Sequence, residues 1–170
     1  MKKILLILAA LVTLVTSVAL ASVQTDYDHA VDFSQYHTYA WGPVKTKDSL
    51  WADRIRQDVD QQLQAKGWKL VTADSDVVIV ALGDSHDEQE EQTFYSGAGG
   101  WLRGGMSGVA TTSTYTTKQG VLVISMFDAK TKKLAWRGTA SGSLSDKPDK
   151  NVGKLSKAVS KMFNKFPPKP

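Results

Sequence analysis

Apolar positions in the first half of the chain predict three β-strands. Residues 23–28 (VQTDYD) alternate as the two faces of a strand do, and residues 38–41 (TYAW) are β-branched and aromatic. Gly42-Pro43 should end the second of these strands. Residues 77–82 (VVIVAL) are apolar without interruption, which is typical of a strand buried on both faces in the middle of a sheet.

The pattern in the second half predicts three further strands. The Thr- and Tyr-containing residues 111–118 predict an exposed strand, and residues 121–127 predict an apolar one. Residues 128–133 (DAKTKK) form a turn signal, so residues 134–144 should be the hairpin partner of the apolar strand. Residues 68–71 fit either a short strand or a connector.

Between these strands, a periodic apolar stripe predicts a helix. It should begin at Asp48 or Ser49 and run to about Lys66, with Gly67 where a helix-terminating glycine belongs. Spacings near 3.6 residues place the following side chains on one apolar stripe: Leu50, Trp51, Ile55, Val59 and Leu63.

A second helix is predicted near the C-terminus, from about Asp149 or Asn151 to a stop at Pro167-Pro168. Its apolar face comprises Val152, Leu155, Ala158, Val159, Met162 and Phe163. Consecutive strands with short connections indicate a largely antiparallel sheet, and the two amphipathic helices should cover one face of it. The predicted class is therefore α+β, with a single sheet and two helices packed on one face.

Residues 1–21 are predicted to be a cleaved secretory signal peptide. Lys2 and Lys3 precede an apolar run that closes on Ala19-Leu20-Ala21, a small-x-small pattern of the kind that signal peptidase cuts. The run contains Thr and Ser and is marginal for a span that needs about 20 apolar residues. We therefore favour a leader over a transmembrane anchor, and we expect residues 22–170 to form one domain without a transmembrane segment.

The chain contains no cysteine, which narrows both its chemistry and its location. Disulfides, thiolate nucleophiles, cysteine-ligated metals and the lipidated cysteine of lipoproteins are all excluded. We therefore expect a periplasmic protein that is not lipidated. Without Lys2 and Lys3 the net charge falls from +4 to +2, and we expect no nucleic-acid partner. The lysines that gather at the C-terminus are interpreted as a solvated helix face, or as a surface for an anionic membrane or glycan.

Two polar segments were considered as ligand sites. Residues 84–92 are acidic and predict a solvated loop, because neither the calcium-loop spacing nor an HExxH pattern is present. Residues 96–108 are rich in glycine but match neither a P-loop nor a dinucleotide turn, so we expect a mobile loop and no cofactor. Within it, Trp101 and Arg103 are candidate contacts for a partner or a membrane surface.

The remaining candidates are Asp26, Asp28 and Arg137. Two residues apart on a strand, the two carboxylates should share a face, and the forked guanidinium of Arg137 suits a carboxylate. These groups predict a structural charge pair or, alternatively, a ligand or substrate site. On the opposite face of the Arg137 strand, Trp136 should pack beneath a helix, and Gly138 should let a neighbouring backbone or ring approach closely.

Several segments together resemble the domain-of-unknown-function 4136 family of bacterial envelope proteins, many of them lipoproteins. The resemblance rests on TDYD at residues 25–28, YHTYAW at residues 36–41 with Trp41, DAKT at residues 128–131, WRGTA at residues 136–140 and FPP at residues 166–168. It implies an α+β envelope domain, and it implies no particular activity. The chain departs from the family pattern in lacking the lipidated cysteine and in carrying His29 and His37.

Two hypotheses for function follow from these observations. The first is a non-catalytic binding or interaction module that recognises an envelope protein, a glycan or a lipid surface. The second is a hydrolase that uses Asp26, Asp28 and Arg137, because two carboxylates on one strand face would have an arginine available. No G-x-S-x-G motif is present, but a catalytic triad of residues distant in sequence remains an alternative. A small-ligand or lipid carrier is a further alternative, and it would need a roomy apolar pocket.

Overall fold

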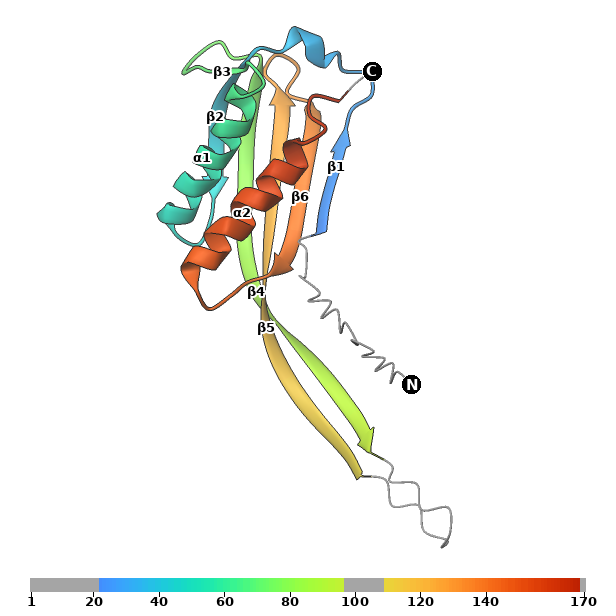
Figure 1. Cartoon of the computed structure of the whole chain (residues 1–170). Helices are drawn as coiled ribbons and strands as arrows, with labels where there is room; N and C mark the ends of the chain where they lie inside the picture. The colour runs from blue at the N-terminus through green and yellow to red at the C-terminus, as the bar shows by residue number, and fades with distance from the viewer. Residues whose placement is uncertain (1–21, 97–108, 169–170) are drawn as a thin grey trace, which may run out of the picture.

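The computed structural model describes residues 22–96 and 109–168, which form a six-stranded mixed sheet and two helices (Figure 1). The elements are β1 (Ser22–Tyr27), a 3-10 turn (Phe33–Gln35), β2 (Thr38–Lys45), α1 (Ser49–Gln64), β3 (Lys69–Leu70), β4 (Val77–Ser96), β5 (Val109–Asp128), β6 (Leu134–Ser143) and α2 (Pro148–Phe163). The strand order is β1-β6-β5-β4-β2-β3. Most neighbours are antiparallel, and β2 is parallel to β3 and β4. The predicted α+β class and largely antiparallel sheet are confirmed.

Both helices lie on the same face of the sheet, as predicted (Figure 1). The side chain of Asp48 caps α1 by accepting a hydrogen bond from the backbone N–H of Trp51 at 3.0 Å. Ile55, Val59 and Leu63 of α1 are buried in the core. Leu50 is 64% exposed, so its predicted place on the apolar stripe is wrong. Ala52 takes the buried position in the first turn instead.

Helix α2 packs on the sheet through Val159, Met162 and Phe163, which are 0–1% exposed. The chain then folds back so that the ring of Phe166 joins the core. Its centroid lies 5.4 Å from Phe163, 5.4 Å from Trp136 and 5.3 Å from Trp68. The aromatic rings therefore connect the C-terminal segment, the sheet and the connection after α1, which explains why a phenylalanine follows the end of the helix.

From Trp136 onward, strand β6 alternates between the covered and the open face of the sheet. Trp136 is 2% exposed beneath α2, and Arg137 is exposed on the other side. Gly138 returns to the covered face, where an added Cβ would lie 2.6 Å from the ring of Trp136 and 2.9 Å from the sulfur of Met162. Only the absence of a side chain at Gly138 lets the tryptophan ring lie across it.

Strand β4 differs from its prediction on two counts. It is central in the sheet as expected, but Val78 and Val80 are only half-buried and Leu82 is 50% exposed, so it is covered on one face rather than two. Residues 84–92, predicted to be a loop, continue the strand and pair with β5 as far as Ser96. A polar sequence forms this strand because its partner β5 supplies the backbone hydrogen bonds.

Two predicted strand ends are also displaced. β2 continues through Gly42-Pro43 to Lys45, because the pairing with β4 shifts register between Trp41 and Val44 and this irregularity accommodates the proline. Residues 111–118 and 121–127 belong to one uninterrupted strand, β5. The predicted glycine-rich loop lies largely in residues 97–108, outside the described residues.

The turn between β5 and β6 is held by Asp128, as the DAKT motif suggests. Its carboxylate accepts hydrogen bonds from the backbone N–H groups of Lys130 and Thr131, and from the hydroxyl of Tyr36 at 2.7 Å. These bonds, that from the Thr131 N–H foremost, lower the pKa of Asp128 to about 2. The charged carboxylate thus links the turn to the segment that leads into β2.

Replacing Gly138 by alanine should destabilise the protein by about 1–3 kcal/mol, because the new Cβ overlaps the Trp136 ring. Gly153→Ala is the matched control, since nothing lies within 4 Å of the added Cβ on exposed α2. The control should raise the free energy of unfolding by up to about 1 kcal/mol, because alanine favours a helix. Urea denaturation of both variants measures the contrast, and equal effects would contradict the close packing.

Asp128→Asn should lower stability at pH 7 by about 1 kcal/mol, allowing for solvent around the carboxylate. The folded-state pKa lies below the ordinary value of 3.8, so this contribution is present above pH 3.8 and is lost as pH falls towards 2. The difference between the two proteins should therefore shrink on acidification. Urea midpoints at several pH values test it, and a constant difference would refute the role of the charge.

Candidate functional site

The face of the sheet opposite the helices carries the candidate site. Residues paired across neighbouring strands share a face, and one row runs Val80–Ser125–Arg137–Asp26 across β4, β5, β6 and β1. Helices cover only the other face of the sheet (Figure 1). The apolar members of the open face are Val78, Val80, Leu82, Val121, Val123 and Phe127. Valine, leucine and phenylalanine side chains on an exposed surface are typical of an interaction site.

Arg137 places a cation beside this apolar strip. Its Nε donates to the Oγ of Ser125 at 3.3 Å, across the strand boundary from β6 to β5. Ser125 is 5% exposed, the one buried polar residue of the described chain. Among the side chains that the structure describes, the two ion pairs are Lys47–Asp84 and Arg56–Asp53, so Arg137 makes no ion pair there. Its guanidinium is bonded to Ser125 and to no described carboxylate.

The predicted aspartates do not form an ion pair with Arg137. Asp26 lies directly opposite it in the β1–β6 register, but its Oδ1 accepts from the backbone N–H of Tyr27 at 2.9 Å. Asp28 follows the end of β1, where its Oδ1 accepts from the N–H of Ala30 at 2.9 Å. The expected ion pair is therefore absent among the described residues, and one oxygen of each carboxylate accepts a hydrogen bond from a nearby backbone N–H. Trp101 and Arg103 lie outside the described residues.

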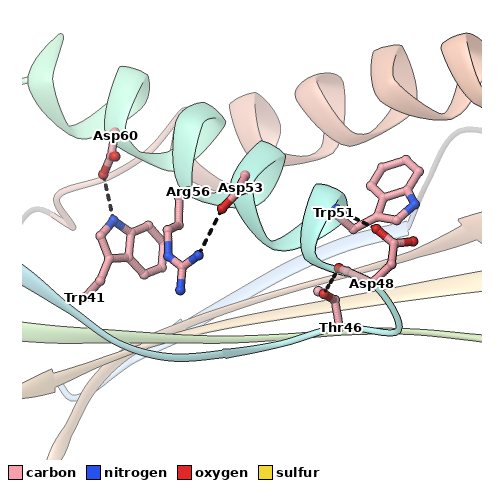
Figure 2. Close-up of polar contacts among 7 residues, drawn as sticks. All are labelled: Trp41, Thr46, Asp48, Trp51, Asp53, Arg56 and Asp60. Carbon is pink, nitrogen blue, oxygen red and sulfur yellow. Dashed lines mark hydrogen bonds and ion pairs between the residues drawn. The ribbon is translucent and has the colours of Figure 1, made fainter.

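A second polar cluster lies between α1 and β2 (Figure 2). The Oδ1 of Asp60 accepts from the indole Nε1 of Trp41 at 2.9 Å and from the hydroxyl of Tyr39 at 2.8 Å. Burial, and then this carboxylate, raise the pKa of Tyr39 above its ordinary value. The guanidinium of Arg56 lies 6.0 Å from the Trp41 ring centre and bonds Asp53 at 3.3 Å.

This cluster satisfies its own polar groups and therefore serves the fold. Beside it a shallow groove of about 560 Å³ is lined by Asp53, Arg56, Gln57, Asp60, Gln61 and Gln64. The sequence pattern assigns no role to Asp60, which the structure shows to be the acceptor at the centre of this cluster. The signal that could have revealed it is the pair of polar-tipped aromatics, Tyr39 and Trp41, which need acceptors when they pack under a helix.

A further hollow of about 420 Å³ lies between α1 and α2, near Asp58 and Lys161. Burial raises the pKa of Asp58, while the hydroxyl of Ser156 donates to its carboxylate at 3.0–3.1 Å and acts in the opposite direction. Within the residues that the structure describes, no three His, Cys, Asp or Glu side chains come together as metal ligands. No helix among them is long and apolar enough to cross a membrane.

The family model for a domain of unknown function, DUF4136, matches residues 23–168. The chain belongs to the DUF4136 family. The match covers all of the elements from β1 to α2 and ends at Pro168, just after the Phe166-Pro167 segment that closes the core. A search of curated proteins finds no match.

Solved structures extend the likeness at the level of fold for this DUF4136 protein. A PDZ domain protein from Parabacteroides distasonis is 15% identical with a TM-score of 0.61, over 89% of this chain and 37% of that one. The chain therefore spans well under half of that protein. PelC from Paraburkholderia phytofirmans, described as a dodecamer, has 11% identity and a TM-score of 0.49 over 85% and 98% of the two chains. A minor lipoprotein from Acinetobacter baumannii has 13% identity and a TM-score of 0.41 over 77% and 90%.

Arg137→Gln should change the free energy of unfolding of this DUF4136 protein by less than about 1 kcal/mol, because the side chain is exposed and makes one side-chain hydrogen bond. A buried arginine that neutralised the aspartates would cost about 3 kcal/mol or more. Chemical denaturation distinguishes the two cases. A loss in the larger range would show that the guanidinium is structural and would remove it from the candidate site.

Proposed function

We propose that this DUF4136 protein is a non-catalytic binding module of the cell envelope that docks a partner protein on the open face of its sheet. The observation that carries the proposal is the guanidinium of Arg137, which makes no ion pair among the described side chains and lies beside the apolar strip of β4 and β5. An unpaired, always-charged group favours a carboxylate, and the valines around it favour apolar contact. The partner should therefore present an apolar segment that carries an acidic side chain.

The position of Arg137 suits recognition. Ser125 fixes the direction of the guanidinium from one side through Nε, while its terminal nitrogens have no partner among the described residues. A fixed fork can make two parallel bonds to a carboxylate with little loss of side-chain freedom. The surrounding apolar side chains would exclude water from that contact once a partner is bound, and would strengthen it.

The location is part of the proposal and rests on the sequence. Residues 1–21 have the charge, apolar run and small-x-small end of a cleaved leader, and β1 begins at Ser22, directly after the predicted cut. With no cysteine to receive a lipid, the product would be free in the periplasm. Residues 22–170 would act there as one domain.

The two alternative functions have less support from the geometry. A hydrolase built on Asp26, Asp28 and Arg137 needs these groups around a cleft, yet they lie on an exposed sheet face and in the turn after β1. A carrier needs an apolar pocket of roughly 300 Å³ or more. The two best-formed hollows of the described chain are surface grooves beside α1 that Asp, Gln, Ser and Lys side chains line.

A photo-reactive residue at Leu82, which is 50% exposed on the open face, should cross-link to the partner in the living envelope. The same residue at the exposed loop position Thr72 is the matched control and should give no such product. Adding Arg137→Glu to the Leu82 variant should abolish the product, because two negative charges would then face each other. Mass spectrometry of the adduct identifies the partner.

Equal cross-linking at both positions would refute docking at the open face. A product that survives Arg137→Glu would refute the role of the guanidinium while leaving the apolar strip in place. The amount of each variant in the soluble envelope fraction shows whether the protein is exported and folded.

A further inference from the structure

Strands β4 and β5 extend far beyond the rest of the sheet as an isolated ribbon (Figure 1). β2 pairs with β4 no further than Leu82, and β6 pairs with β5 no further than Gln119. Residues 87–96 and 109–118, here called the arm, therefore pair only with each other, apart from the Lys118 carbonyl that accepts from Leu144. At about 3.3 Å per residue, the arm projects roughly 30 Å.

The arm is mostly polar, and it pairs with no further strand among the residues that the structure describes. A two-stranded ribbon is only marginally stable alone in water, and both of its outer edges present unpaired backbone groups. Asp87, Glu88 and Glu91 on β4 are exposed, and the strand opposite supplies mainly Thr side chains. Lys118 faces Asp87 at the base of the arm. The β4 side of the arm is thus acidic on both faces of the ribbon.

Helix α2 presents a complementary surface. Lys150, Lys154, Lys157 and Lys161 are exposed and follow each other at helical spacings of four, three and four residues. They form one lysine stripe on the side of α2 away from the buried Val159 and Met162. Neither of the ion pairs in the described chain involves this stripe. The Nζ of Lys154 donates to the backbone carbonyl of Ser143 at 2.7 Å, but no described carboxylate neutralises the four charges, so the stripe can attract an acidic partner.

The two surfaces match in length but cannot meet within one chain. The stripe extends about 16 Å at 1.5 Å per residue, and the acidic part of the arm about 13 Å. The arm points away from the sheet body that carries α2 (Figure 1). We propose that the acidic arm of one copy docks on the lysine stripe of a second copy. Because arm and stripe are different surfaces, the contact is head-to-tail and builds rings or open chains rather than two-fold dimers.

The test is self-association of the protein purified after export, measured by sedimentation velocity at about 50 mM and about 500 mM NaCl, since salt screens exposed charges. Oligomers should form at low salt, with an association constant that falls about tenfold or more at high salt. Glu88→Lys with Glu91→Lys makes the net charge of the arm positive. Asp87 and Lys118, which lie opposite each other in the strand register, are unchanged. Lys150→Glu with Lys157→Glu leaves the stripe with no net charge, because Lys154 and Lys161 remain. Each double variant alone should be monomeric.

The decisive experiment mixes these two variants. In the mixture, the unchanged arm of the stripe variant meets the unchanged stripe of the arm variant, so mixed complexes should form although neither variant associates with itself. Lys69→Glu with Lys133→Glu is the matched control, because it changes the net charge by the same amount on exposed positions outside α2. This control should assemble as the natural protein does.

A natural protein that is monomeric at low salt would overturn the proposal. Association of the Lys150→Glu/Lys157→Glu variant with itself would also overturn it. The same holds if the two variants stay monomeric when mixed, while circular dichroism shows that both are folded. Binding of the lysine stripe to vesicles of anionic lipid without any self-association would assign the stripe to a membrane instead. None of these results bears on cross-linking at Leu82, so the two proposals can fail separately.

Discussion

The burial of Trp136 beneath α2 determines most of what the two faces of this molecule present. The ring lies across Gly138 and against Phe163 and Phe166, where any side chain at Gly138 would displace it. Since successive residues of a strand point to opposite faces, a buried Trp136 places Arg137 on the open face. The short WRG sequence thus joins the core to the candidate site with no residue between them.

The same two strands build the core, the open face and the arm. On its covered face the β4–β5 pair contributes Ile79, Ile124 and Met126, which are fully buried. On the other face it supplies the apolar strip, and beyond residue 86 it continues as the polar arm. A partner that bound the strip or the arm would therefore act on strands anchored in the core. Rigid presentation of that kind lowers the entropy cost of binding.

Charge is segregated along the molecule even though the net charge is small. Acidic groups gather on the β4 side of the arm and basic groups on α2, while Arg137 stands isolated on the open face. Two carboxylates, Asp60 and Asp128, accept hydrogen bonds from tyrosine, tryptophan or backbone donors and link separate elements of the fold. The described chain thus combines hydrogen-bonded carboxylates between its elements with exposed charges on its surface.

Local pattern was enough to determine the class, both helices and the turn that Asp128 holds, because these depend on periodicity, capping and short connections. It also indicated the close approach at Gly138.

Three features depended on the tertiary structure. VVIVAL was predicted to be covered on both faces, but both helices pack on one side and leave Val78, Val80 and Leu82 open to solvent. Residues 84–92 were predicted to be a loop, because a ribbon with two wet faces has no apolar alternation, and only pairing with β5 makes them a strand. Arg137 bonds Ser125 rather than an aspartate, although Asp26 lies opposite it in the register of β1 and β6. A sequence determines which residues alternate between the two faces of a strand. Which face is covered, and which charged side chain lacks an ion-pair partner, depend on how elements that are distant in sequence pack together.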